Sequence, residues 1–277
     1  MNETISQIFY PSNLQEFFSA ANRFGTANLF SYDIYKMLDQ RGKTVDLPKV
    51  IIDANQITEL HNINRTERYI EIGSMVNLNQ IFKLGKILPD VMRQSLDVLY
   101  GRFLRNLISI GSIVCQTSEP EPLAAALIAL DVRCELRTNV QSRWISALRL
   151  TGPDKLNIFF PQEILYRVRI PLEQWDFTLC KYFYSTDSDK TENGFIVFLA
   201  RIQNDILSDV RVVFSGSFIL RDRNCEASLI GQKLPLAKKE AAAFTHLWKN
   251  NLNESIPPFL RYRILSFIEN AILQFAD

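Results

Sequence analysis

The sequence predicts an α+β protein, in which helices and strands pack in separate layers. The chain has 277 residues, enough to bury a sizeable core in one large domain or two small ones. Hydrophobic residues make up 47% and charged residues 22%, which is ordinary globular usage and excludes disordered and fibrous classes. Helical periodicity and strand alternation both recur along the chain, and the alternating segments dominate its C-terminal part.

The first segment combines one clear helix with short strands. Residues 12–25 predict a helix with apolar side chains on one face and Ser12 as its N-cap. Residues 26–30 and 49–53 predict strands, and residues 32–38 predict a short helix. This alternation of strands and helices favours parallel strand pairing.

The middle segment predicts short strands, several helices and a turn at a glycine. In residues 69–73, apolar Ile70 and Ile72 alternate with Glu71 and Gly73, which is typical of a strand with one buried face. Further strands are predicted in 132–137, 143–150 and 163–172, and helices in 78–85, 88–101 and 122–131.

A domain boundary is predicted near Pro171, where the pattern changes. Three antiparallel strands follow in residues 177–185, 195–202 and 210–220, separated by polar turns. Two helices then close the chain, in residues 236–250 and 260–275.

Charge and hydropathy exclude two classes of partner. Lys and Arg total 31 against 30 Asp and Glu, and no run of like charges offers a basic face, so nucleic acid is not expected. The longest apolar run, residues 123–130, is far shorter than the ~20 residues that span a bilayer, so no membrane partner is expected. A cytoplasmic location is the default expectation.

Cysteine and histidine usage argues against metal and hydrolytic chemistry. No two cysteines form a CxxC pair, so zinc or iron–sulfur ligation within this chain is not expected. Neither His61 nor His246 lies in an HExxH arrangement. We therefore predict no catalytic and no metal-ligating residue, and interpret the cysteines as small buried hydrophobic residues: Cys115, Cys134, Cys180 and Cys225.

Several short phrases, taken in order, resemble the FAD-binding subunit of molybdenum hydroxylases, the xanthine dehydrogenase group. The phrases are KVIIDANQITEL, YIEIGSMVNL, RNLISIGSIV, IALDVRCEL, EILYRVRIP, EASLIGQKL and RYRILSFIENAI. Each is weak alone, but their common order and spacing over nearly the whole chain make the resemblance specific.

The resemblance implies a fold and a division into domains. Residues 1–171 would form a two-lobed FAD-binding domain of the vanillyl-alcohol-oxidase/PCMH type, with lobes at 1–53 and 54–171. Residues 172–277 would form a C-terminal α+β domain, a three-stranded antiparallel sheet with helices packed against it.

The resemblance also implies a cofactor site built on two glycine turns. Turns without Cβ atoms let backbone N–H groups approach the FAD diphosphate closely. The early turn aligns with LFSYDI at residues 29–34, where Phe30 and Ser31 stand at glycine positions and Asp33 is retained. In the later turn the first glycine is retained and Ser112 replaces the second. The cofactor-binding residues that the resemblance implies are Asp33, Ser109, Ile110, Gly111 and Lys181.

Three functions are consistent with this resemblance. In the first, the chain is the FAD-binding electron-transfer subunit of a xanthine dehydrogenase-like oxidoreductase, passing electrons from iron–sulfur clusters to NAD or another acceptor. Its partners in a heteromeric complex would be an iron–sulfur subunit and a molybdenum-cofactor subunit. In the alternative, which the replaced glycines motivate, the chain has lost FAD and serves as an assembly or regulatory component. A third alternative is that the loops bind another nucleotide or a smaller phosphate ligand.

Overall fold

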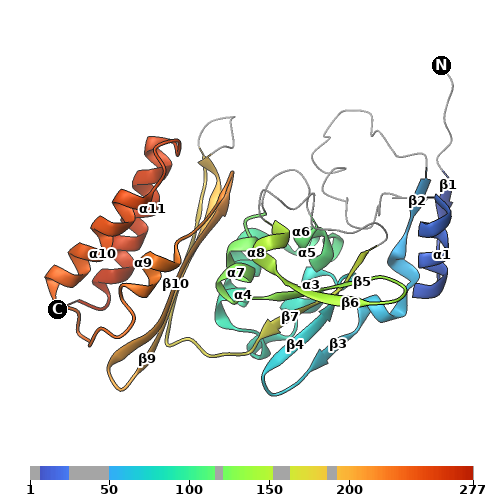
Figure 1. The fold of residues 1–277 in the computed structure, drawn as a ribbon, viewed down its shortest axis with the longest axis horizontal. Coiled ribbons are helices and arrows are strands. Elements are labelled where there is room, and N and C mark those ends of the chain that lie inside the picture. Colours follow the sequence, from blue (N-terminus) through green and yellow to red (C-terminus); the bar gives the residue numbers. More distant parts are fainter. Residues whose placement is uncertain (1–6, 25–49, 116–120, 152–162, 186–191, 277) are drawn as a thin grey trace.

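The elements of the protein form three groups along its longest axis (Figure 1). The structure is a computed structural model that describes residues 7–24, 50–115, 121–151, 163–185 and 192–276. A small N-terminal unit lies at one end, a five-stranded sheet with helices occupies the middle, and a four-stranded sheet with helices lies at the other end.

The N-terminal unit contains two strands and one helix. β1 (Gln7–Phe9) pairs in parallel with β2 (Val50–Ile52), which lies in the predicted strand of residues 49–53. β1 itself is not predicted from the sequence. The predicted helix is also confirmed, as α1 (Leu14–Phe24). Its cap is Asn13 rather than Ser12, since the Asn13 Oδ1 accepts the N–H of Glu16 at 2.9 Å. The strand and helix predicted in residues 26–38 lie outside the described residues.

The middle group is an antiparallel sheet of five strands, in the order β3-β4-β7-β5-β6. The predicted strand over residues 143–150 is partly wrong, because β6 ends at Ser146 and α8 then begins. Ala147 and Leu150 are buried on one face of that helix. The strands are β3 (Ile63–Arg65), β4 (Tyr69–Gly73), β5 (Arg133–Arg137), β6 (Ser142–Ser146) and β7 (Ile164–Pro171).

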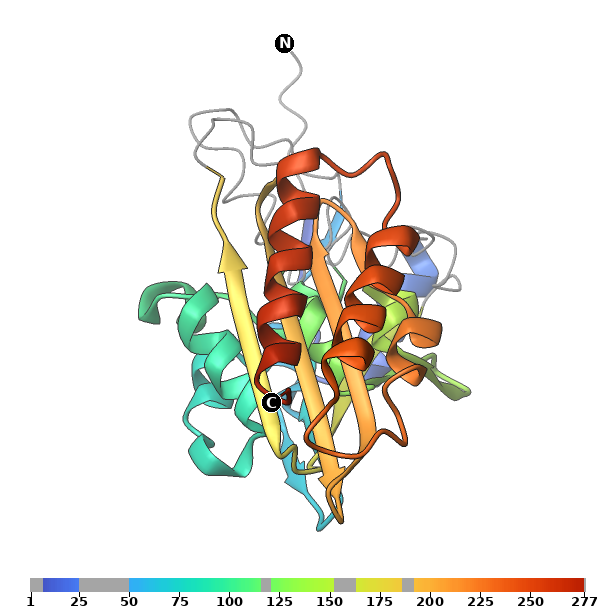
Figure 2. The same ribbon diagram turned by 90° about the vertical axis from the view of Figure 1, so that its left-hand side faces the viewer.

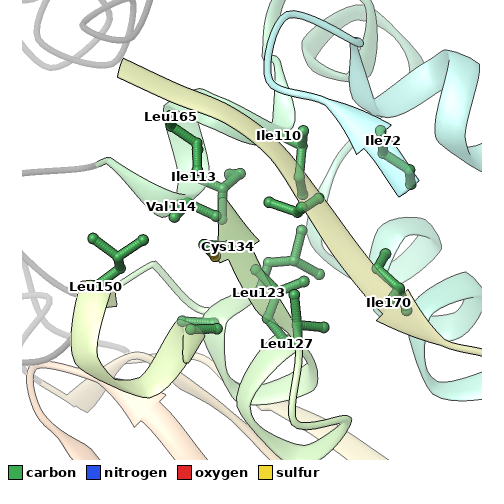
Figure 3. Packing of buried hydrophobic residues seen from close by; sticks show 14 of the residues in the cluster. Ile72, Ile110, Ile113, Val114, Leu123, Leu127, Cys134, Leu150, Leu165 and Ile170 are labelled. Carbon is green, nitrogen blue, oxygen red and sulfur yellow. The ribbon is translucent and has the colours of Figure 1, made fainter. Parts of the chain in front are cut away.

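Helices cover one face of this sheet and enclose its core. Ile72, Cys134 and Ile170 point from the strands into the same cluster as Leu123 and Leu127 from a helix (Figure 3). The helices are α3 (Leu78–Phe82), α4 (Asp90–Leu99), α5 (Arg102–Leu107), α6 (Ile110–Val114), α7 (Ala124–Ala129) and α8 (Ala147–Thr151), with short 3-10 turns at Ala54–Gln56 (η2), Thr58–His61 (η3) and Gly85–Ile87 (η4).

The opposite face of the five-stranded sheet carries charged side chains in ion pairs. Glu71 of β4 contacts Arg167 and Arg169 of β7, and Glu135 of β5 also contacts Arg167. The Arg169 guanidinium lies 4.0 Å from the ring centroid of Trp144. This alternation of apolar and charged residues is the pattern that the sequence shows in residues 69–73.

The C-terminal sheet has four antiparallel strands in the order β11-β10-β9-β8, one more than predicted. The third predicted strand, residues 210–220, reverses direction at Gly216, whose N–H donates to the Phe218 carbonyl at 3.0 Å. The final short strand therefore pairs back on its predecessor. The strands are β8 (Phe177–Phe183), β9 (Gly194–Gln203), β10 (Ile206–Gly216) and β11 (Ile219–Arg221).

Both faces of this second sheet are covered. α9 (Arg223–Ala227), α10 (Lys238–Asn251) and α11 (Pro258–Leu273) lie on the outer face, as Figure 2 shows for the two long helices. α4 and α7 contact the inner face, at β8 and at β9 and β10. The predicted C-terminal antiparallel sheet with helices is thus confirmed, with a fourth strand added.

Arginines of the second sheet hold the end of α7. Arg211 donates to the Ala129 carbonyl at 2.6 Å, and Arg221 donates to the Ile128 carbonyl at 3.1 Å. Both also contact Asp131, at 2.8 and 2.7 Å. Cations at the C-terminal end of a helix satisfy its last carbonyls and oppose its dipole. These contacts fix the second sheet against the middle group.

The proposed domain boundary falls between the two sheets. β7 ends at Pro171 and β8 begins at Phe177, so residues 172–176 connect them. The division into 1–53, 54–171 and 172–277 follows the three groups and stays a proposal. In the described part of the chain no helix is long and apolar enough to cross a membrane. No group of three His, Cys, Asp or Glu side chains suited to a metal ion occurs among those same residues.

The cysteines are free thiols, and two of them, Cys134 and Cys225, are buried as predicted. Cys115 and Cys180 are half-buried. Burial raises the pKa of the Cys134 thiol to about 12, because an apolar surrounding disfavours the thiolate.

We expect Cys134 to resist alkylation in the folded protein, since the thiolate is the reactive form and the side chain is fully buried. Peptide mass spectrometry after iodoacetamide treatment should show Cys134 modified only when denaturant is present. Equal modification with and without denaturant would contradict this placement.

Candidate cofactor site

The candidate site is built on the turn that follows β4. Gly73 ends this strand, and its N–H donates to the Asn62 carbonyl at 2.8 Å. A Cβ atom at Gly73 would overlap the Leu60 carbonyl oxygen, so the close approach of these two backbone segments requires glycine. The Met75 N–H donates to the same Leu60 carbonyl at 2.9 Å. The hydrogen bonds to Leu60 and Asn62 therefore fix the position of the turn.

α6 lies beside this turn and is joined to it by backbone hydrogen bonds. The Gly111 N–H donates to the Ser74 carbonyl at 2.9 Å, and the Ile110 N–H donates to the Val76 carbonyl at 3.0 Å. The predicted residues Ile110 and Gly111 are thus brought together with the end of β4. Gly111 lies in the first turn of a helix, whereas the sequence predicts a phosphate-cradling turn at this position.

Ser109 caps this helix. Its Oγ accepts the N–H of Ser112 at 3.2 Å, and the two serine hydroxyl oxygens lie 3.0 Å apart. Both serines are buried. All five residues of α6 are buried. The space around Ser109 and Ser112 therefore favours small side chains.

The apolar side chains of α6 anchor it in the core of the middle group. Ile110, Ile113 and Val114 point into the cluster that contains Leu165 and Cys134 (Figure 3). Burial of such side chains contributes roughly 1.5–3 kcal/mol each. The position of the helix is therefore set by packing as well as by its hydrogen bonds to the β4 turn.

These contacts test how the described residues fit an FAD diphosphate. The N–H groups of Ile110, Gly111 and Ser112 each have an acceptor within the chain, at 3.0, 2.9 and 3.2 Å. They are not available as the amide donors that the resemblance implies. These residues therefore fit a positioning role next to a cofactor and do not form a diphosphate cradle by themselves.

The early turn at residues 29–34, with Asp33, lies outside the described residues. The later predicted residue, Lys181, is described and lies on β8. Side chains alternate along a strand, so Lys181 shares the face of Leu179 and Phe183, which packs toward α11. Its neighbour Cys180 points the other way and its Sγ lies 3.4 Å from the Gln94 Oε1 of α4.

The structure therefore does not bring Lys181 together with Ser109, Ile110 and Gly111. An alignment gives a position along the chain, but a shift of one residue reverses the face on which a strand side chain lies. The role of Lys181 in FAD binding stays a prediction that this placement does not support.

Sequence reasoning did not single out a cluster around Glu121, directly after the undescribed segment 116–120. The Tyr100 hydroxyl donates to the Glu121 carboxylate at 3.1 Å, and the Ser215 hydroxyl donates to its carbonyl at 2.8 Å. Tyr182 lies on the face of β8 that packs against the middle group, and burial raises the pKa of its phenol, with smaller contributions from Tyr184 and Glu121. No sequence pattern links these residues: Tyr100 directly follows α4, Glu121 precedes α7, and Tyr182 and Ser215 lie on β8 and β10.

Solved structures show which fold the chain has. The fold matches carbon monoxide dehydrogenase from Hydrogenophaga pseudoflava with a TM-score of 0.80 and 17% identity, covering 98% of this chain and 96% of that one. It matches quinoline 2-oxidoreductase from Pseudomonas putida 86 with a TM-score of 0.79 and 14% identity, again covering 98% and 96%. The chain therefore shares the α+β fold of these two chains, and the predicted fold class is confirmed.

The family follows from the sequence. A profile described as FAD binding domain in molybdopterin dehydrogenase matches residues 4–173, and the chain belongs to this family. Xanthine dehydrogenase of Oryza sativa subsp. japonica is 28% identical over 207 residues, and xanthine dehydrogenase 2 of Arabidopsis thaliana is 28% identical over 249 residues.

These matches cover 67% and 81% of this chain but only 15% and 18% of the plant proteins. The chain thus corresponds to the FAD-binding domain of xanthine dehydrogenase-like molybdenum hydroxylases, and the predicted resemblance is confirmed. FAD is the cofactor of this family.

Proposed function

We propose that this chain is the flavin component of a xanthine dehydrogenase-like molybdenum hydroxylase. In this proposal it binds FAD and passes electrons from iron–sulfur clusters to NAD or another acceptor. The observation that carries the proposal is the family match over residues 4–173, together with a fold that extends over 98% of the chain. An iron–sulfur subunit and a molybdenum-cofactor subunit are the proposed partners, and the cytoplasmic location stays a prediction.

The residues of this chain position the cofactor and do no acid–base chemistry on substrate. FAD, when bound, supplies the redox chemistry, and the protein supplies its binding, orientation and electrostatic surroundings. The turn at residues 73–76 and α6 form a rigid, buried support for the diphosphate-binding half of the site. Asp33 remains the proposed residue of the early turn.

The direct test is to purify the protein and record its visible absorbance before and after incubation with FAD. We expect flavin absorbance that remains with the protein after gel filtration. A colourless product that gains no flavin from an excess of FAD would contradict the proposal.

A second function is favoured by two observations. The N–H groups of Ile110, Gly111 and Ser112 are engaged within the chain, and the early turn has Phe30 and Ser31 at glycine positions. A relative that has lost FAD and acts in assembly or regulation would have these features. The colourless outcome of the absorbance experiment would support this alternative, provided that the purified protein is folded by circular dichroism.

A substitution at the cap of α6 tests the positioning role. Ser109→Ala removes the cap, which should lower the free energy of unfolding by about 1 kcal/mol. If an ordered α6 is required for binding, FAD affinity should fall about fivefold for the same reason. Asp222→Ala is the matched control, because Asp222 caps α9 through the N–H groups of Asn224 and Cys225 in the C-terminal group. It should cost similar stability and leave FAD affinity unchanged; an equal loss of affinity in both variants would exclude a local role.

A further inference from the structure

A cavity of about 280 Å³ lies between β8 and α11, on the outer face of the second sheet. Figure 2 shows β8, in yellow, as the outermost strand beside α11, in red. The apolar part of the cavity lining comes from Leu179 and Phe183 of β8 and from Phe267 of α11. Ser266 and Asn270 add polar groups on the helix side.

Two cations also line this cavity. Lys181 is exposed, although it lies on the strand face whose other side chains pack toward α11. The Arg263 guanidinium lies 4.5 Å from the ring centroid of Phe183, and its Nη1 donates to the Tyr184 carbonyl at 3.0 Å. These contacts orient Arg263, and the hydrogen bond uses only one of the five N–H donors of its guanidinium.

In the part of the chain that the structure describes, neither cation has an acidic partner. Among the described residues, no carboxylate forms an ion pair with Lys181 or Arg263, and no acidic side chain lines the cavity. The partly buried arginines on the strands of this sheet, Arg201, Arg211 and Arg221, each pair with at least one carboxylate. Both cations therefore lie beside the aromatic walls of the cavity without a carboxylate partner among the described residues.

We propose that the cavity binds a small aromatic carboxylate. The ring would lie against Phe183, Phe267 and Leu179, and the carboxylate would accept hydrogen bonds from Lys181 and Arg263. Binding sites combine apolar walls with a few charged groups that fix orientation, and this volume, near the lower limit of such sites, suits a ligand with a single ring. The guanidinium fork matches the geometry of a carboxylate.

A different explanation exists for Lys181 alone. Charged residues on an outermost strand protect its free edge against pairing with another chain. That explanation does not account for Arg263, which comes from a helix, or for the cavity between them. The two explanations predict different consequences of substituting each cation.

The test uses benzoate as the probe and benzyl alcohol as a neutral analogue of similar shape. Titration calorimetry and two-dimensional NMR of the full chain should show benzoate binding with a dissociation constant on the order of a millimolar. The amide signals of Ser266 and Asn270 should shift. The dissociation constant of benzyl alcohol should be at least about tenfold higher, because benzyl alcohol cannot form the charge-assisted hydrogen bonds.

Two variants and one control complete the experiment. Arg263→Gln and Lys181→Met should each weaken benzoate binding, the first by about tenfold and the second by about threefold because Lys181 is exposed. Lys249→Gln, an exposed lysine of α10 outside the cavity, should leave the affinity unchanged.

Two results with the unmodified protein would overturn the proposal: equal affinities for benzoate and benzyl alcohol, or no binding at the highest soluble benzoate concentration. So would a Lys181→Met variant that aggregates more readily but binds benzoate normally, which is the result expected of edge protection. The outcome is independent of FAD, because the cavity lies on the face of the second sheet opposite α4 and α7 and the titration reads only benzoate.

Discussion

Gly73→Ala should destabilise the protein by about 3 kcal/mol or more, a large part of the ~5–15 kcal/mol that typically stabilises a folded domain. A Cβ atom here would overlap the Leu60 carbonyl oxygen and lie 2.5 Å from the Leu60 carbonyl carbon and 3.1 Å from the His61 nitrogen. These are backbone atoms, which cannot rotate away as a side chain would. Relief requires the strand to move away from the η3 turn, and the hydrogen bonds from Gly73 to Asn62 and from Met75 to Leu60 would then be lost.

Urea unfolding followed by circular dichroism would measure this effect. Gly101→Ala is the matched control, because a Cβ atom at Gly101 meets no atom within 4 Å. It should change the free energy of unfolding by less than about 1 kcal/mol. Similar losses in the two variants would show that the contact between β4 and Leu60 is not as close as described.

The same substitution should also weaken FAD binding. The carbonyls of Ser74 and Val76 hold α6 through the N–H groups of Gly111 and Ile110, so displacing the turn displaces the helix. FAD titration at a temperature where the variant is still folded separates this local effect from global unfolding. Unchanged FAD affinity in folded Gly73→Ala would contradict the positioning role proposed for α6.

Arg221→Met should be the second strongly destabilising change, with a loss of about 3–5 kcal/mol. The Arg221 and Glu226 side chains are 6% and 5% exposed, and their nearest atoms lie 3.1 Å apart. Without Arg221, the Glu226 carboxylate keeps the Val212 N–H as a partner at 2.9 Å but loses its nearest cation. Removing one partner leaves a buried charge without compensation, which costs more than the pair contributes.

This loss should depend on pH in a defined direction. Burial is the largest influence on Glu226 and raises its pKa above the ordinary value of 4.5, while Arg221 lowers it. A raised carboxyl pKa means that the folded state binds the proton more tightly than the unfolded state. The stability from this group is therefore fully present below about pH 4.5 and is lost as pH rises through the folded pKa. In Arg221→Met the pKa should rise further, so the deficit should be largest at neutral pH and smaller in mild acid.

Urea unfolding of both proteins at neutral and mildly acidic pH would measure this difference. Arg93→Met is the control, because Arg93 and Asp90 form a pair whose side chains are 45% and 67% exposed. Exposed pairs of this kind contribute about 0–1 kcal/mol. The double variant Arg221→Met, Glu226→Leu should recover much of the loss. A deficit in Arg221→Met that stays constant with pH would show that Glu226 is not its cause.

The contacts of Arg221 also connect the second sheet to the middle group, which contains α6 and the β4 turn. Arg221 and Arg211 bind the last carbonyls of α7 and the Asp131 carboxylate. α7 follows Glu121, which is itself held by Tyr100 and Ser215. The C-terminal group thus supports the chain on either side of α7 as well as packing against it.

Local patterns of the sequence were sufficient to determine the fold class and most elements. The spacing of Phe17, Phe18 and Ala21 buries one face of α1, and the alternation of Ile70 and Ile72 buries one face of β4. Helix and strand periodicities of this kind depend only on neighbours along the chain. The order of short phrases was likewise sufficient for the family, because it needs no contact between distant residues.

Tertiary structure alone decided which predicted donors are available. Whether the Gly111 N–H is available to a diphosphate depends on the Ser74 carbonyl, and the face on which Lys181 lies depends on the register of β8 against β9. The reversal that creates β11 depends likewise on its pairing with β10. A hydrogen bond has a directed geometry between atoms far apart in sequence, so the identity of a residue predicts what it can donate but not where that donor is already engaged.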